Sequence, residues 1–172
     1  QNKQNLLQPL NADTKCSCTT AKSITKDQLY GEYKNISWIA GIIDTPAGPV
    51  PQISTRIKRS EHFEQFRARL SSFRMKFSLK PGLYAVGTPA STSDILVTAN
   101  YRLSFDHLRK ALKGMDAWIL VLDTNGINVW CAAGKGTFGT DELIKRIKLT
   151  GIEKCVEHKR LILPQLGAPG VN

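Results

Sequence analysis

The hydrophobic pattern is most regular in the second half of the chain, where apolar runs alternate with helical spacings. Residues 95–98 and 117–122 are apolar runs of strand length, and the second run contains no polar residue. An uninterrupted run of this kind is typical of a central parallel strand that helices cover on both faces. Between the two runs, the spacing predicts a helix that Ser104 caps and Gly114 ends, with a buried stripe of Phe105, Leu108, Ala111 and Leu112.

A second amphipathic segment follows at residues 140–151. Thr140 is a suitable N-cap, acidic residues occupy the first turn, and Gly151 provides the stop. Short final strands are predicted at residues 154–157 and 161–163. This order of elements predicts an α/β fold with an open, mostly parallel Rossmann-like sheet and helices on both faces. In such sheets, ligands bind beyond the carboxyl ends of the strands.

The first half of the chain is less regular. An apolar run at residues 38–43 predicts a strand, and the proline- and glycine-rich residues 44–51 predict a long turn after it. Residues 74–79 alternate as a half-buried strand would, and residues 83–86 predict another strand after a Pro-Gly turn. Residues 61–70 predict a helix, because Phe63, Phe66, Arg67 and Leu70 stand at helical spacing, and the spacing of the phenylalanines suits core packing.

The length of 172 residues and the hydrophobic content of 41% fit one folded domain with a substantial core. Residues 1–24 are rich in small polar side chains and predict a flexible tail, which leaves residues 25–172 as the domain. The chain begins without Met and ends in a loop-like run, so we expect it to be part of a longer protein.

The cysteines, Cys16, Cys18, Cys131 and Cys155, lack the regular spacing of a secreted disulfide framework. This favours a reducing, cytoplasmic setting. No stretch approaches the roughly 20 apolar residues that a membrane span needs. Cys16 and Cys18 could together hold a soft metal ion, but their place in the polar tail favours no such role. The histidines, His62, His107 and His158, have no partners at metal-ligand or catalytic spacing.

The formal net charge of +10 is concentrated between Arg56 and Lys80, where eight basic residues face two acidic ones. Nucleic acid is not the expected partner, because the phenylalanines of this block have the spacing of core residues rather than of base-stacking side chains. An anionic membrane surface, an acidic protein partner and a simple solvated face all remain possible explanations of the charge.

Cys131 lies in the most chemically suggestive segment. If a short helix begins near Asn128, Cys131 falls in its first turn, where the helix dipole favours a thiolate, the form that binds metal. The small residues after it would let a large flat ligand approach the backbone. The alternative is that Cys131 is a small buried residue in a packed turn. The loops expected to line one crevice with it are residues 98–100, 123–126, 128–135 and 164–167.

A dinucleotide-binding site is a rival hypothesis. Gly134, Gly136 and Gly139 spell G-x-G-x-x-G before a helix, and Glu157 follows about 20 residues later. However, no uninterrupted apolar strand runs directly into the first glycine. The glycines could equally cradle a different flat or phosphate-bearing cofactor.

Residues 128–135 read Asn-Val-Trp-Cys-Ala-Ala-Gly-Lys and match completely the motif of the corrinoid protein of microbial mercury methylation. Residues 81–87, 96–101, 116–123, 134–139 and 163–170 resemble the same family, so the resemblance covers about residues 38–170. That family is similar in turn to the large subunit of the corrinoid iron–sulfur protein of the acetyl-CoA pathway.

The resemblance implies a domain that holds cobalamin in its base-off form, beneath which a short cap helix places Cys131 as the lower cobalt ligand. Thr98 then lies near the opposite, reactive face, so Cys131 and Thr98 are the expected catalytic residues. The His-containing motif of free-standing cobalamin domains is missing, which agrees with ligation by Cys. The expected cofactor contacts are Thr98, Asn100, Asp123, Gly126, Asn128, Val129, Trp130, Cys131, Ala132, Ala133, Gly134, Lys135, Gly136, Thr137, Gly139, Gln165 and Gly167.

A thiolate opposite the methyl group donates electron density, which favours transfer of methyl as a carbanion or radical. The resemblance therefore implies methylation of Hg(II), with a methyl carrier of the acetyl-CoA pathway and a nucleotide-binding redox or regulatory domain as alternatives. The implied partners are a ferredoxin-like iron–sulfur reductant and a methyl donor protein or methyl-folate system. The implied location is the cytoplasmic face of the inner membrane, to which further segments of the parent protein would anchor the domain.

Overall fold

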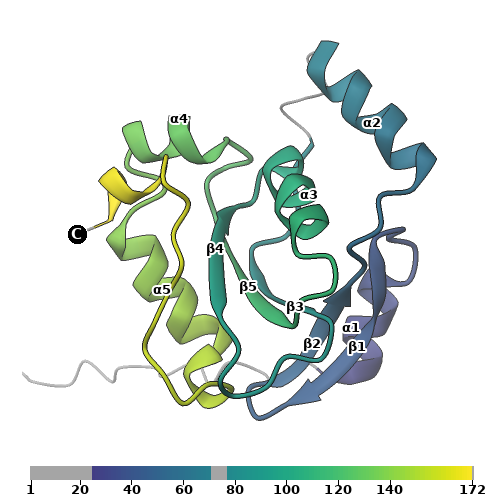
Figure 1. Ribbon diagram of the computed structural model, residues 1–172, viewed down its shortest axis with the longest axis vertical. Coiled ribbons are helices and arrows are strands. Elements are labelled where there is room, and N and C mark those ends of the chain that lie inside the picture. The colour runs from purple at the N-terminus through teal and green to yellow at the C-terminus, as the bar shows by residue number, and fades with distance from the viewer. Residues whose placement is uncertain (1–24, 71–76, 172) are drawn as a thin grey trace, which may run out of the picture.

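The computed structural model describes residues 25–70 and 77–171, which form one five-stranded sheet with helices packed around it (Figure 1). The strands are β1 (Ile39–Thr45), β2 (Gly48–Ile53), β3 (Gly82–Val86), β4 (Ile95–Ala99) and β5 (Ala117–Leu122). The helices are α1 (Lys26–Tyr33), α2 (Arg59–Leu70), α3 (Arg102–Ala111), α4 (Val129–Gly134) and α5 (Thr140–Thr150), with 3-10 turns η2 (Ile152–Lys154) and η3 (Ala168–Gly170).

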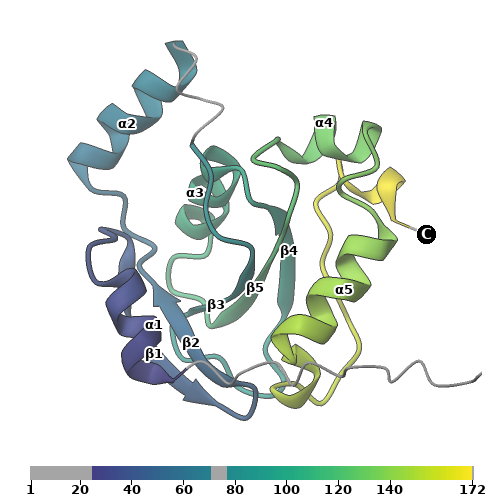
Figure 2. The ribbon, with the colours of Figure 1, turned by 180° about the vertical axis from the view of Figure 1, so that it is seen from behind.

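The strands lie in the order β1-β2-β3-β5-β4. Parallel pairing joins β2 to β3 and β4 to β5, and a single parallel bridge joins Leu96 to Ile162 at the open edge of β4. The pairs β1–β2 and β3–β5 are antiparallel. The α/β class and the open sheet are therefore confirmed, and Figure 2 shows the sheet from behind.

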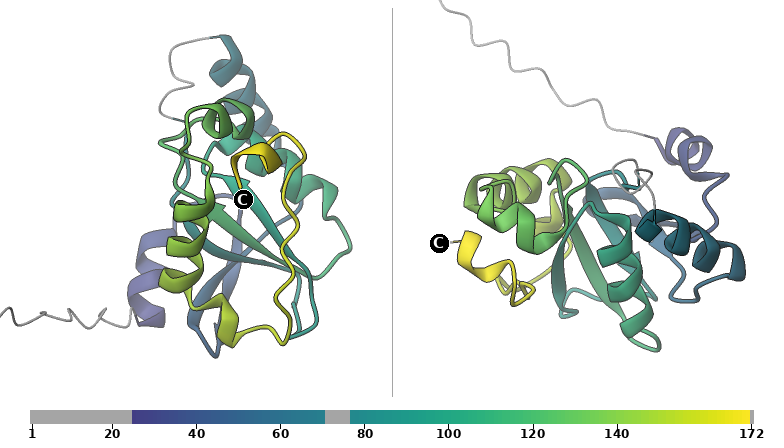
Figure 3. Two further views of the ribbon diagram at one scale, coloured as in Figure 1. Left: turned by 90° about the vertical axis from the view of Figure 1, so that its left-hand side faces the viewer. Right: turned by 90° about the horizontal axis from the view of Figure 1, so that it is seen from above.

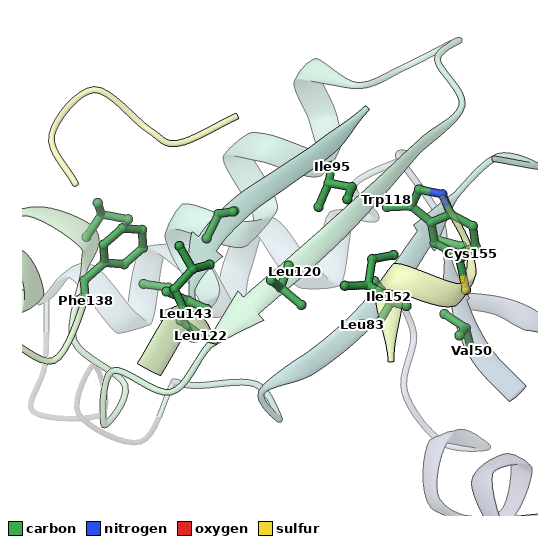
Figure 4. Packing of buried hydrophobic residues seen from close by; sticks show 14 of the residues in the cluster. Val50, Leu83, Ile95, Trp118, Leu120, Leu122, Phe138, Leu143, Ile152 and Cys155 are labelled. Carbon is green, nitrogen blue, oxygen red and sulfur yellow. The ribbon is translucent and has the colours of Figure 1, made fainter. Parts of the chain in front are cut away.

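Strand β5 separates two hydrophobic cores, because its side chains alternate between the two faces of the sheet. Trp118, Leu120 and Leu122 pack in the core beneath α5 (Figure 4), whereas Ile119 and Val121 pack in the core beneath α1 and α3. All six residues of β5 are buried. Figure 3 shows α3 and α5 on opposite sides of the sheet, so the prediction of a central strand covered on both faces is confirmed, but β5 is parallel only to β4 and is antiparallel to β3.

The long turn predicted at residues 44–51 is wrong, because most of these residues belong to the β1–β2 hairpin. The turn is shorter: the Thr45 hydroxyl donates to the Gly48 carbonyl and accepts from the Ala47 N–H. Pro49 and Pro51 are tolerated within β2 because β2 pairs with β3 only at Gln52 and Ile53. At the prolines, β2 therefore behaves as an edge strand, where a missing N–H costs no sheet bond.

Helix α2 forms where the pattern predicts it, but the opposite face packs inward. Phe63, Phe66 and Leu70 are 63%, 59% and 71% exposed, whereas Glu61 is only 1% exposed. Glu61 is drawn inward by buried arginines of α3 that compensate its charge. Apolar spacing alone cannot predict this orientation, since the anchoring interaction is ionic.

The predicted helix boundaries need small corrections. Helix α3 begins at Arg102 with Tyr101 as its N-cap, so Ser104 lies inside the helix rather than capping it. Gly139 takes the N-cap position of α5, one residue before Thr140. The predicted stop at Gly151 is confirmed, because Gly151 adopts the left-handed conformation with φ 61°.

The final strands predicted from the sequence are largely wrong. Lys154 is the last residue of the 3-10 turn η2 and residues 155–157 form no strand after it, while residues 161–163 contribute one bridge to β4 rather than a strand. Residues 77–79 of the strand predicted at 74–79 alternate between buried and exposed, but they form only a single bridge, from Ser78 to Tyr101. Residues 74–76, the predicted tail and Cys16 and Cys18 lie outside the described residues. Within the described ranges, every helix is too short or too polar to cross a bilayer.

Candidate functional site

A short helix begins directly after Asn128, as the sequence predicts. The Asn128 side chain caps α4 by accepting a hydrogen bond of 2.9 Å from the backbone N–H of Cys131. The Asn128 carbonyl accepts a second bond from the N–H of Ala132. Both interactions are typical of a well-formed N-cap, and they place Cys131 in the first helical turn.

The two faces of α4 differ in burial. Val129 and Ala132 are buried and pack against the core beneath α5. Trp130 is 69% exposed, and Cys131 is half-buried with a free thiol. Because successive helical residues are about 100° apart, Trp130 and Cys131 share the outer face. The alternative, that Cys131 is a small buried residue in a packed turn, is therefore met only in part, because its burial is intermediate.

An apolar groove of about 450 Å³ opens beside the start of α4, at the carboxyl end of β4. Three of the predicted site residues, Thr98, Val129 and Gln165, line it together. The remaining lining residues are mostly aliphatic: Leu96, Val97, Ser104, Leu108, Ile162, Leu163, Pro164 and Leu166. Three of the four segments expected to line one crevice, residues 98–100, 128–135 and 164–167, therefore contribute to this groove, whereas residues 123–126 do not line it. Figure 1 shows α4 above the ends of β4 and β5.

Asn100 organises the neighbouring loop instead of lining the groove. Its side-chain oxygen accepts hydrogen bonds from the N–H groups of Thr124 (3.0 Å) and Gly126 (2.9 Å), and lies 2.8 Å from the Thr124 hydroxyl. Its side-chain nitrogen donates to Asp123 at 3.3 Å. Thr124 is fully buried and was not predicted as a site residue. The signal was available, since a Thr-Asn-Gly turn after a buried strand needs a partner for its backbone N–H groups.

The glycine-rich segment after Cys131 lacks the geometry of a dinucleotide loop. Such a loop leads from a strand through the first glycine into a helix. Here Gly134 is the last residue of α4, Gly136 turns the chain with φ 75°, and Gly139 is the N-cap of α5. The N–H groups of Thr137 and Phe138 both donate to the carbonyl of Ala132, so the segment folds back onto α4. Lys135 is exposed at this turn.

A buried network of charges lies on the other side of β4. Arg109 Nε donates to Asp106 at 2.7 Å, Arg109 Nη2 donates to Glu61 at 2.9 Å, and Arg102 Nε donates to Asp106 at 2.9 Å. Burial alone raises the pKa of Glu61, but hydrogen bonds from the Lys58 N–H, the Ser37 hydroxyl and Arg109 outweigh burial and hold that pKa below its ordinary value.

The network does not offer an obvious ligand site. Arg102 stacks over the Trp38 ring, with 4.7 Å between the guanidinium carbon and the ring centroid. Its Nη2 atom makes no hydrogen bond among the described residues but lies 3.5 Å from a Glu61 oxygen. Within the same ranges, no cluster of three or more Asp, Glu, His or Cys side chains could hold a metal ion.

The comparisons with known proteins assign the family. The model of the CO dehydrogenase/acetyl-CoA synthase delta subunit family matches residues 72–170. The chain belongs to this family. It is 36% identical over 88 residues to the acetyl-CoA decarbonylase/synthase complex subunit gamma of Methanopyrus kandleri, covering 50% of this chain and 19% of that protein.

Two further relatives are gamma subunits of the same complex. That of Methanocaldococcus jannaschii is 33% identical over 93 residues, covering 53% of this chain and 19% of the relative. That of Archaeoglobus fulgidus is 31% identical over 97 residues, covering 55% of this chain and 21% of the relative. The matched region thus spans about a fifth of each relative. The expected kinship with proteins of the acetyl-CoA pathway is confirmed, whereas mercury methylation gains no support from these relatives.

Proposed function

We propose that this domain binds a corrinoid at the carboxyl edge of β4 and β5 and carries a methyl group on its cobalt. The observation that carries the proposal is the position of Cys131, a free, half-buried thiol on the outer face of the capped helix α4. Its neighbour Trp130 is exposed, which offers apolar surface that a flat macrocycle would cover.

The residues around Cys131 fit such a cofactor. A corrin ring supplies four nitrogen ligands to cobalt, so one protein ligand suffices and no cluster of ligating side chains is needed. The aliphatic groove beside α4 suits a large organic ligand, and Thr98 lies within it.

Each side chain has a distinct part in the proposed chemistry. A corrinoid, when bound, would supply a cobalt–carbon bond from which a methyl group can leave. Cys131 would hold the cobalt through its thiolate and donate electron density to it, while Asn128 orients Cys131 by capping its N–H. Asn100 holds the loop after β5 in place rather than touching the reacting atoms.

The relatives favour an acceptor within the acetyl-CoA pathway. They are gamma subunits of an acetyl-CoA decarbonylase/synthase complex, which supports a methyl carrier that passes its methyl group to a neighbouring subunit. On this proposal the partners are other subunits of such a complex. These relatives support the carrier role better than mercury methylation.

Hg(II) is the second candidate acceptor, and one specific observation supports it. Residues 128–135 match the complete motif of the mercury-methylating family, including the cysteine. A thiolate bound to cobalt would favour delivery of methyl as a carbanion, which the electrophile Hg(II) accepts directly, or as a radical, which would need one further electron from the reductant. This candidate would bring a ferredoxin-like reductant, a methyl donor protein or methyl-folate system, and a membrane-anchored parent protein at the cytoplasmic face.

The cofactor assignment is tested by absorption spectroscopy of the purified chain loaded with hydroxocobalamin. We expect a thiolate-ligated spectrum that Cys131→Ala abolishes and Cys155→Ala retains, because Cys155 is buried beside Thr45 in the core. An identical spectrum in the Cys131→Ala variant would remove the ligand assignment.

The acceptor is tested with the reduced, methylcobalamin-loaded protein in two parallel reactions. One contains Hg(II) and is assayed for methylmercury; the other contains an acetyl-CoA synthase subunit with CO and coenzyme A and is assayed for acetyl-CoA. Acetyl-CoA without methylmercury supports the carrier role, and methylmercury without acetyl-CoA supports the second candidate. Methyl transfer in neither reaction would overturn both.

A further inference from the structure

The segment after residue 160 connects the open edge of β4 with the cap helix α4. The N–H of Val97 donates to the carbonyl of Ile162 at 2.9 Å, and the N–H of Ile162 donates to the carbonyl of Ile95 at 2.8 Å. The chain then turns at Pro164, whose carbonyl accepts from the N–H of Gly167, and enters η3 beside α4. We call residues 164–171 the strap; Figure 1 shows it in yellow next to α4.

Gly167 is buried where the strap meets α4. A Cβ atom at this position would stand 2.6 Å from Cε1 of Phe138 and 2.8 Å from Cγ1 of Val129, both closer than real contacts allow. Gly167 has φ −99° and ψ −18°, a conformation that other residues adopt readily. Its lack of a side chain therefore provides space rather than backbone freedom.

Gly170 makes a second close approach to the same unit. A Cβ atom there would collide with the carbonyl oxygen of Phe138 and would lie 3.3 Å from Cα and Cβ of Ala133. The strap thus touches the cap helix through two glycines three residues apart, at Val129 in its first turn and at Ala133 near its end.

These contacts reach Cys131 through a short rigid connection. Val129 precedes Cys131 by two residues in the same turn, and Phe138 is tied to α4 because its N–H donates to the Ala132 carbonyl at 3.1 Å. Phe138 is fully buried, so it has little room to yield to an added methyl group. A side chain at position 167 must displace the strap or α4.

We propose that Gly167 and Gly170 are positioning residues that set the height of α4 above the sheet edge and thereby the position of the Cys131 sulfur beneath the corrinoid. This inference rests on the proposed function. It changes the role expected for Gly167, which supports the helix that carries the ligand instead of contacting the cofactor itself.

The test compares Gly167→Ala with two controls, each loaded with hydroxocobalamin. Gly31→Ala adds the same methyl group in α1, where a Cβ meets nothing within 4 Å. Ala168→Val enlarges an exposed residue of the strap next to Gly167. We expect Gly167→Ala to retain cobalamin through gel filtration but to lose most of the thiolate-ligated absorption, while both controls keep it. Retention of the full thiolate spectrum in Gly167→Ala would overturn the inference.

A rescue variant separates positioning from general damage. Phe138→Leu removes Cε1, the atom closest to the added Cβ, so Gly167→Ala combined with Phe138→Leu is expected to regain the thiolate spectrum. If Gly167→Ala does not fold, this double variant takes its place and is compared with Phe138→Leu alone. A double variant that folds, binds cobalamin and lacks the spectrum present in Phe138→Leu alone would contradict relief of the clash as the cause.

A measurement without cofactor keeps this inference distinct from the proposed function. The alkylation rate of Cys131 by N-ethylmaleimide, followed by peptide mass spectrometry of the apoprotein, is expected to change several-fold in Gly167→Ala and to stay unchanged in Ala168→Val. An unchanged rate in Gly167→Ala overturns the positioning role. If the wild-type chain shows no spectrum that depends on Cys131, the proposed ligand fails, whatever the Gly167 variants do.

Discussion

Two helices flank the carboxyl end of β4, and their chemistry is opposite. Helix α3 buries Arg102, Asp106 and Arg109 in a network with Glu61 of α2. Helix α4 contains no charged residue and exposes Trp130 next to the free thiol of Cys131. The charged side is closed and its groups are used to hold helices together, whereas the uncharged side is open. In this domain the cluster of charged side chains therefore has a structural role, whereas the candidate functional site contains a single thiol, Cys131, on an apolar surface.

The largest expected change in free energy comes from breaking the charged side. Arg109→Met leaves Glu61 and Asp106 buried with one cation fewer, and loss of one partner from such a network costs about 3–5 kcal/mol. Lys110→Met, on the exposed side of the same helix, is the matched control. Urea unfolding measures both. Equal stabilities for the two variants would mean that the network contributes little to holding α2 and α3 together.

The next effect concerns the open side and is expected in function rather than stability. Cys131→Ala should slow methyl transfer by more than the ~10–100-fold that loss of a supporting group around a metal typically costs, because it removes the proposed ligand itself. The thermal midpoint of the apoprotein should hardly move, since Cys131 is only half-buried. A large drop in the thermal midpoint with unchanged methyl transfer would show that Cys131 has a structural role and not a functional one.

A smaller effect is expected where the two sides meet. Asn100→Ala removes the acceptor of the Thr124 and Gly126 N–H groups, and leaving buried donors unpaired costs about 2 kcal/mol. Asn35→Ala, at an exposed turn, is the control. Urea unfolding with cobalamin titration of the folded variant gives both readouts. We expect Asn100→Ala to bind cobalamin more weakly and to be less stable. If neither cobalamin binding nor stability changes, the loop after β5 does not depend on the hydrogen bonds from Asn100.

The smallest effect is the acid response of Glu61. The pKa of Glu61 is lower in the folded chain than in the unfolded chain. Its ionised form therefore stabilises the fold fully when the pH is above the pKa of the unfolded chain. This stabilisation is lost as the pH falls through the pKa of the folded chain. Stability measured by urea between pH 6 and pH 3 should therefore decline less steeply below about pH 4 in Glu61→Gln than in the wild-type chain. Parallel curves would show that other carboxylates dominate the acid response.

The sequence predicts the elements around the candidate site better than those around the charged network. Strand β5, the cap at Asn128 and the stop at Gly151 depend on local signals, namely an apolar run, a side-chain acceptor and a left-handed glycine. The inward turn of Glu61 depends on Arg109, 48 residues away, and no local pattern contains that information. The same limit applies to Pro49. It is tolerated in β2 because only β1, and not β3, pairs with β2 at that position.

The site itself was predictable in part for the same reason. The motif at residues 128–135 is contiguous, so it marks Cys131 without knowledge of the fold. Thr124 and the packing role of Gly167 were missed because their partners, Asn100 and Phe138, lie far along the chain. Contacts between distant segments are set by tertiary packing, which a residue spacing does not encode.

The attachment of residues 162–166, which form one wall of the groove, bears on how the domain would acquire its cofactor. One wall of the groove is joined to β4 by a single bridge at Ile162, whereas the sheet behind it is continuous. Local opening of such an edge costs far less than global unfolding. Loading with a macrocycle would then proceed through a brief parting of this wall from β4 in the folded protein, so that entry and escape rates would depend on the wall more than on the stability of the core.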